Sequence, residues 1–274
     1  MQLVLPAAAG RLLSPMMSAV EILGLALSGA AAGAINAVAG GGTLVTFPTL
    51  LFYGTPSVVA NATSTLALVI GTAGSVYGFR RHLDIIKPWL RRFLPVSILG
   101  GLIGSALLTF TSDRVFSHLV PFLILFATIL FLAQGAFRRM ADPKERQLHP
   151  HHHSVSGAIL FQFVVAIYGG YFGAGIGILM LASLGYIGLS NIHQMNTLKT
   201  VLGSLINLVA AIWFVGAGLI HWPRAGVMTM GALAGYFLGS HYSQRISQKR
   251  VRQIISVIGF VLSAATFYME FIRR

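Results

Sequence analysis

The sequence has no cysteine and very little charge. Without cysteine the chain cannot form disulfides, iron–sulfur clusters or thiolate zinc sites. Charged residues are 9% of its 274 residues, against about 25% in an average globular protein, which is too few to cover a soluble domain. Disorder and a nucleic-acid-binding domain are therefore excluded, although the net charge is +13. With 55% hydrophobic residues and a mean hydropathy of +0.79, the sequence predicts an all-α polytopic membrane protein.

Apolar runs divide the chain into membrane segments and loops. A bilayer core of about 30 Å requires about 20 apolar residues in a helix. Two runs, Thr43–Tyr53 and Ile176–Ile187, are too short to cross comfortably, and each follows a glycine cluster. No cleavage site stands before the first long run, so residues 16–39 are expected to be a retained helix. The eight long segments expected to be transmembrane helices are 18–38, 58–79, 93–111, 115–137, 155–172, 194–220, 225–243 and 251–272.

Basic residues gather in three loops between these segments, at 80–92, 138–154 and 244–252. By the positive-inside rule these loops face the cytoplasm. The basic excess is then explained by topology and by contact with anionic membrane lipids. We therefore expect a multi-pass protein of the bacterial inner (plasma) membrane that has no nucleic-acid partner.

Residues at constant spacing indicate an internal duplication. We expect a first transmembrane repeat at 18–137, a basic His-rich cytoplasmic linker at 138–154 and a second repeat at 155–272. If the short segment crosses the membrane, each half has five crossings and the repeats are inverted; if it is re-entrant, they are parallel. Placing all three basic loops inside requires the inverted arrangement, which we favour. The matching pairs are Asn61/Asn196, Pro88/Pro223, Gly100/Gly235, Gly104/Gly239 and Ser105/Ser240, each 135 apart, and Gly40/Gly173 and Gly42/Gly175, each 133 apart.

Two glycine clusters predict helix breaks in matching positions of the two halves. Glycine permits positive φ and close approach of the backbone to a ligand, and Thr43 is expected to be the N-cap of the half-helix that follows. The N-termini of half-helices attract anions, and paired broken helices are typical of a transporter's binding site. The alternative is that the glycines only let helices pack closely. The clusters read Asn36-Ala-Val-Ala-Gly-Gly-Gly-Thr43, followed by Phe47-Pro48, and Gly169-Gly-Tyr-Phe-Gly173-Ala-Gly175-Ile-Gly177.

A polar run follows each short segment. Polar side chains are costly in hydrocarbon and usually face a cavity or a neighbouring helix. Lys199 is the basic residue clearly inside a predicted span, and we interpret it as a contact for an anionic substrate. The alternative is that Lys199 lies near its helix end and extends to the membrane interface. The runs are Asn61-Ala-Thr63-Ser64-Thr65 and Asn196-Thr197-Leu-Lys199-Thr200, with Asn207 farther along the second helix.

Residues 34–69 and 168–214, which carry these motifs, resemble the two characteristic blocks of the sulfite exporter TauE/SafE family of membrane transporters. The resemblance extends over about residues 18–270. It implies an inner-membrane permease that moves sulfite, organosulfonates or similar small oxyanions, usually outward. Ser64 stands where relatives often have asparagine. The positions that the resemblance assigns to substrate binding are Asn36, Gly40, Gly41, Gly42, Thr43, Pro48, Asn61, Thr63 and Ser64 in the first half, and Gly173, Gly175, Gly177, Asn196, Lys199 and Asn207 in the second.

The positions of the six acidic residues bear on the driving force. Proton-coupled pumps usually place Asp or Glu inside the membrane, whereas all six acids here lie in loops or near segment ends. An inside-negative potential moves an anion outward with about 2.3 kcal/mol per charge per 100 mV. The sequence therefore favours export without a coupling ion. The alternative is cation-coupled uptake of sulfonates or other small organic anions, with His193 and Lys199 as coupling groups. The acids are Glu21, Asp84, Asp113, Asp142, Glu145 and Glu270.

Other functions fit the sequence less well. An enzyme would need a nucleophile or an acid–base pair at membrane depth, and neither G-x-S-x-G nor H-E-x-x-H occurs. No catalytic residue and no cofactor are therefore expected. A membrane scaffold without transport activity would not require paired helix breaks. The histidines at 149–153 lack the acid or cysteine that would complete a metal site, so no bound metal is expected. A homo-oligomer is left open.

Overall fold

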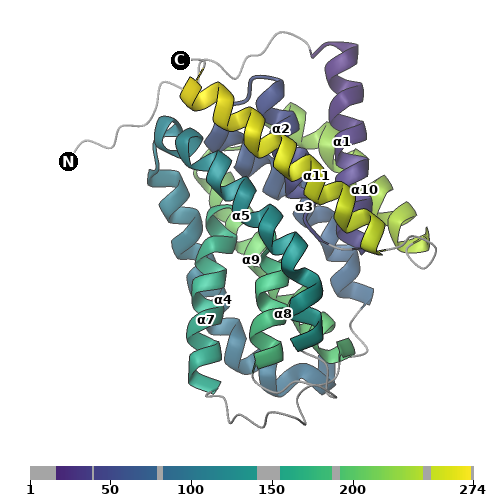
Figure 1. Ribbon diagram of the computed structural model, residues 1–274, viewed down its shortest axis with the longest axis vertical. Helices are drawn as coiled ribbons and strands as arrows, with labels where there is room; N and C mark the ends of the chain where they lie inside the picture. The colour runs from purple at the N-terminus through teal and green to yellow at the C-terminus, as the bar shows by residue number, and fades with distance from the viewer. Residues whose placement is uncertain are drawn as a thin grey trace.

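The computed structural model of the chain describes residues 17–38, 40–78, 83–140, 155–186, 192–242 and 248–272. Every regular element within these ranges is helical, as predicted (Figure 1). The order of long and short helices is the same in both halves. The helices are α1 (Ala19–Val38), α2 (Thr43–Phe52), α3 (Ser57–Gly78), α4 (Leu83–Phe110) and α5 (Asp113–Met140), then α7 (Val155–Tyr171), α8 (Ile176–Tyr186), α9 (Ile192–Gly216), α10 (Trp222–Tyr242) and α11 (Gln248–Phe267), which ends in the π-helical turn η3 (Tyr268–Ile272).

Five of the described helices are long and apolar enough to cross a membrane, whereas the sequence predicted eight. The other three predicted segments correspond to α3, α7 and α10. The described part of α7 has 17 residues. Helix α10 has Pro223 and Arg224 in its first turn and contains several glycines, which lower its hydropathy. The five segments are Ala19–Ala37, Ile86–Phe110, Asp113–Ala133, Gln194–Gly216 and Gln253–Ile272.

Each short helix folds back against the long helix before it. The Tyr53 hydroxyl, just after α2, donates to the carbonyl oxygen of Val20 at 3.4 Å, close to the start of α1. In the second half the Ser183 hydroxyl of α8 donates to the carbonyl oxygen of Ala158, in the first turn of α7, at 3.5 Å. The pairs α1–α2 and α7–α8 are therefore helical hairpins, and each hairpin has its bend at one of the predicted breaks.

Helices in matching positions of the two halves run in opposite directions. Thr55, just before α3, accepts a hydrogen bond from Arg224 Nη1 at 2.6 Å, in the first turn of α10. The start of α3 therefore lies at the same end of the molecule as the end of α9. Figure 1 shows the same inversion for the hairpins, because α1 descends from the upper end whereas α7 rises from the lower end. The two halves thus have opposite orientations. Most of the predicted linker, residues 141–154 with its histidines, lies outside the described residues.

Small residues let the halves interlock. Helix α1 packs along α10, and α4 packs along α7. A Cβ atom on Gly33 would overlap the carbonyl oxygen of Ala232, and one on Gly104 would overlap that of Ile167. Such close backbone contact requires glycine and is typical of helix interfaces in membranes. Each of these two interfaces joins one half of the chain to the other.

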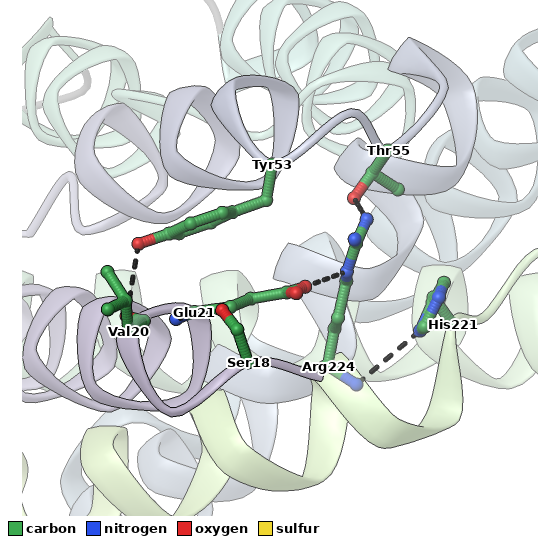
Figure 2. A network of polar contacts seen from close by, with 7 residues as sticks. All are labelled: Ser18, Val20, Glu21, Tyr53, Thr55, His221 and Arg224. Carbon is green, nitrogen blue, oxygen red and sulfur yellow. Dashed lines mark hydrogen bonds and ion pairs between the residues drawn. The ribbon is translucent and has the colours of Figure 1, made fainter. Parts of the chain in front are cut away.

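A shielded ion pair also joins the halves, at the end where α1 and α10 begin (Figure 2). Arg224 Nε donates to Glu21 Oε1 at 2.7 Å, and the same guanidinium donates to Thr55. The side chains of Arg224 and Glu21 are only 14% and 15% exposed. The pair therefore fastens the first hairpin and the start of α3 to α10.

Candidate functional site

A cavity of about 440 Å³ lies between the bends of the two hairpins. Its volume is in the range of small-molecule binding sites. Helices α1, α2, α3, α5, α8, α9 and α10 all contribute to its wall. Ten of the fifteen predicted site residues line this cavity, namely Asn36, Gly40, Gly41, Thr43, Gly173, Gly175, Gly177, Asn196, Lys199 and Asn207.

Matching positions of the two halves both contribute to the cavity wall. Residues 135 apart, such as Thr72 and Asn207, both line the cavity. Both α3 and α9, and both hairpin bends, therefore contribute to the site, with more lining residues from α9 than from α3. Further matching pairs in the wall are Gly40/Gly173, Thr65/Thr200 and Leu68/Gly203.

The first break depends on two glycines and one asparagine. Gly40 and Gly41 have φ of +80° and +96°, which side-chain-bearing residues rarely adopt. A Cβ on Gly41 would also overlap the ring of Phe131. Asn36 Oδ1 accepts a hydrogen bond from the Gly42 N–H at 2.7 Å and so caps the start of α2. The prediction that Thr43 is the N-cap is wrong: Gly42 holds that position, and the capping side chain comes from α1.

The second break is held within its own hairpin. Gly173 and Gly175 have φ of +83° and +79°. The Tyr168 hydroxyl of α7 donates to the carbonyl oxygen of Ala174 at 2.8 Å, which satisfies a carbonyl group that the bend removes from the helix. Both predicted breaks therefore exist, but a different side chain stabilises each.

Lys199 lines the cavity from the second half. It is half-buried on α9, two turns from the start of that helix. Its stem lies over the first turn of α8, because a Cβ on Gly177 would be 3.2 Å from Lys199 Cδ. Among the described lining residues Lys199 is the one basic side chain, and no acidic residue lines the cavity.

Five predicted site residues lie outside the cavity wall. Asn61 is buried, and its Nδ2 donates to the carbonyl oxygen of Tyr171 at 3.0 Å. Thr63 accepts the backbone N–H of His221, which tethers α3 to the start of α10. Their contacts stabilise the packing of α3 against the second half. The other three are Gly42, Pro48 and Ser64. The Gly42 N–H donates to Asn36, Pro48 is buried inside α2, and the Ser64 hydroxyl bonds that of Thr46 at 2.6 Å.

Several lining residues were not among the predicted ones. Ser204 continues the stripe of Asn196, Thr200 and Asn207 at helical spacing, so periodicity along α9 could have identified it. Tyr236 of α10 left no such signal, because Gly101 stands at the matching position in the first half. The unpredicted lining residues are Ala37, Thr65, Leu68, Thr72, Phe131, Phe172, Ile176, Ile178, Thr197, Thr200, Gly203, Ser204 and Tyr236.

Comparisons with known proteins agree on a membrane transporter. Residues 25–266 match the family described as "Sulfite exporter TauE/SafE". The chain is 28% identical over 243 residues to a "Probable membrane transporter protein" of Haemophilus influenzae, covering 88% of this chain and 92% of that protein. It is 24% identical over 239 residues to "Probable membrane transporter protein YfcA" of Escherichia coli K12, covering 86% of each chain. No solved structure matches.

Proposed function

The chain belongs to the sulfite exporter TauE/SafE family of multi-pass membrane proteins, and on that premise we propose that it exports sulfite or organosulfonate-type oxyanions across the inner membrane. One observation carries this proposal. The cavity between the two hairpin bends has a polar wall with one basic side chain, Lys199, and no acidic one among its described residues. Such a wall attracts an anion and offers a cation no carboxylate partner.

The proposed role of Lys199 is to supply charge on one side of the substrate. Amide and hydroxyl groups supply neutral hydrogen bonds around it. The first turn of α2 and that of α8 add the partial positive charge of helix N-termini. The phenyl rings of Phe131 and Phe172 limit the space beside the bends. The neutral donors are Asn36, Thr43, Asn196, Thr197, Thr200, Ser204 and Asn207, whereas the Thr65 and Thr72 hydroxyls donate to the carbonyl oxygens of Asn61 and Val69.

The direction of transport follows from charge. An anion in the cavity gains about 2.3 kcal/mol per charge per 100 mV on moving outward along an inside-negative potential. The described lining contains no carboxylate that could carry a coupling proton. The opposite orientation of the two halves supports alternating access, in which one half rocks against the other about a site near the midplane.

Flux into and out of proteoliposomes tests this proposal. Purified protein is reconstituted, a potassium diffusion potential is imposed in each direction, and movement of sulfite, methanesulfonate and sulfate is followed, with protein-free liposomes as the control. We expect sulfite or sulfonate flux that follows the potential without a cation gradient. Flux that requires a proton or sodium gradient would establish coupled uptake instead. No flux of any of the three anions would contradict the proposed substrate class.

A further inference from the structure

The hydroxyl group of Tyr236 has a fixed direction, set by a chain of hydrogen bonds that begins at the first break. The Gly42 N–H can only donate, so the Asn36 atom that it meets at 2.7 Å must be the carbonyl oxygen. The other end of that amide is then an NH₂ group, which can only donate. Its Nδ2 lies 2.9 Å from the Tyr236 oxygen, and the tyrosine oxygen is therefore the acceptor.

An acceptor for the proton of this hydroxyl is missing among the residues that the structure describes. Tyr236 is 7% exposed and lines the cavity together with Asn36. Within the described part of the chain, the hydroxyl of Tyr236 bonds to Asn36. The Asn36 amide donates to a lone pair of the tyrosine oxygen and so leaves the hydroxyl proton unused. A buried hydroxyl proton without an acceptor is costly, which favours a ligand that accepts it.

The ring of Tyr236 occupies space that is open because residue 71 is a glycine. A Cβ on Gly71 of α3 would overlap this ring, so Gly71 creates the space in which the ring lies. The matching positions in the other half reverse the arrangement: Ile206 replaces Gly71 and lies 3.6 Å from the Cβ position of Gly101, which replaces Tyr236. Gly169 stands at the position that matches Asn36. The donor chain thus exists on one side of the cavity and has no counterpart on the other.

From this geometry we infer that Tyr236 is a specificity-determining residue, whose hydroxyl donates to an oxygen of the transported oxyanion. This assignment rests on the proposed function. Tyr236 of α10 and Lys199 of α9 line the same cavity, and an oxyanion has several acceptor oxygens for contacts on more than one side. Asn36 is a positioning residue, since it holds the hydroxyl with its proton toward the cavity.

The test measures the concentration dependence of sulfite flux for Tyr236→Phe. Loss of a hydrogen bond to a charged group raises KM about tenfold or more, with a small change in maximal rate. Tyr53→Phe is the matched control, because the Tyr53 hydroxyl bonds a backbone carbonyl at the far end of α2, and it should keep the wild-type KM. Gly71→Ala keeps the tyrosine but displaces its ring, and should raise KM in the same direction.

A double-mutant cycle separates the direction of the hydroxyl from its presence. Asn36→Asp still accepts from Gly42 but cannot donate, so the tyrosine hydroxyl would turn to the carboxylate and away from the cavity. Asn36→Asp should therefore raise KM more in the wild-type background than in the Tyr236→Phe background. Wild-type KM in Tyr236→Phe, with sulfite flux present, would overturn this inference and leave the proposed function intact. An absence of sulfite flux in the wild-type protein would overturn both.

Discussion

The two hairpin bends are both built on positive-φ glycines but differ in chemistry. Each has two glycines with φ between +79° and +96°, and each short helix begins directly after its bend. The first bend is braced across the halves, through Asn36 to Tyr236, whereas the second is braced within its own hairpin, through Tyr168. Ser64, at the position that matches Lys199, is buried against Thr46.

The difference teaches how a duplicated frame can bind one asymmetric ligand. The frame needs glycine at the bends and along the helix interfaces in both halves, because backbone geometry leaves no room for side chains. The chemistry need not be duplicated. Charge comes from the second half, through Lys199, and the oriented hydroxyl also lies on a second-half helix but depends on Asn36 of the first.

The largest effect should come from filling both helix interfaces. Gly104→Leu, between α4 and α7, and Gly239→Leu, between α1 and α10, occupy matching positions, and both should lower the unfolding free energy by about 3 kcal/mol through overpacking. Gly226→Leu is the control, because a Cβ there meets nothing within 4 Å. Thermal unfolding in detergent measures this. A large loss of stability in only one of the two variants would show that the two interfaces are not equivalent.

The next effect compares adjacent glycines of the first bend. Gly40→Ala adds backbone strain of about 1–2 kcal/mol but no overlap, because a Cβ there meets nothing within 4 Å. Gly41→Ala adds similar strain and also displaces Phe131 from the cavity wall. We expect sulfite flux at least tenfold lower in Gly41→Ala than in Gly40→Ala, at matched protein insertion. Equal flux would show that shape at this bend is not required for transport.

The sequence predicted the frame better than the chemistry. Glycine clusters, short apolar runs and an isolated lysine are local anomalies, so both breaks and Lys199 could be found without a structure. Composition does not tell which side of a helix faces a cavity, and Asn61 and Thr63 were therefore assigned to a site that Thr65 and Thr72 line instead. Tyr236 was missed because an aromatic residue in an apolar helix also fits ordinary packing.

The prediction of eight membrane spans is confirmed in part. Runs of alanine and glycine raise the apolar content of a segment such as α10 without giving it the hydropathy of leucine-rich helices. Among the residues that the structure describes, five helices have both the length and the hydropathy of a membrane span. Helix α10 packs closely along α1 through glycine and alanine.

A smaller loss of stability is expected from the ion pair of Arg224, which has no equivalent at the matching position of the other half. Arg224→Met leaves Glu21 and Thr55 without their shared donor and should lower stability by about 2 kcal/mol. At the matching end of the other half Trp89 replaces Arg224, and Arg92 lies 5.5 Å above the Trp89 ring. Arg92→Met, at an exposed position, should cost less than about 1 kcal/mol. Equal losses in thermal unfolding would show that the ion pair has no special role.

The smallest expected effect is a pH dependence of stability. Burial, and then the Arg224 charge, lower the pKa of His221, in the connection between α9 and α10, below its ordinary value of 6.5. The folded protein therefore binds fewer protons than the unfolded chain, so stability is complete above pH 6.5 and falls as the pH drops below it. His221→Gln should flatten this slope between pH 7 and about pH 5. An unchanged slope would assign the pH dependence to other groups.

Sulfite flux in Lys199→Ala tests the central claim most directly, since that claim assigns anion recognition to this one charge in the cavity. Lys87→Ala is the matched control, because Lys87 is an exposed lysine on α4 outside the cavity wall. At equal insertion and equal imposed potential, the account predicts that flux is abolished in Lys199→Ala and unchanged in Lys87→Ala. Wild-type flux in Lys199→Ala would contradict it.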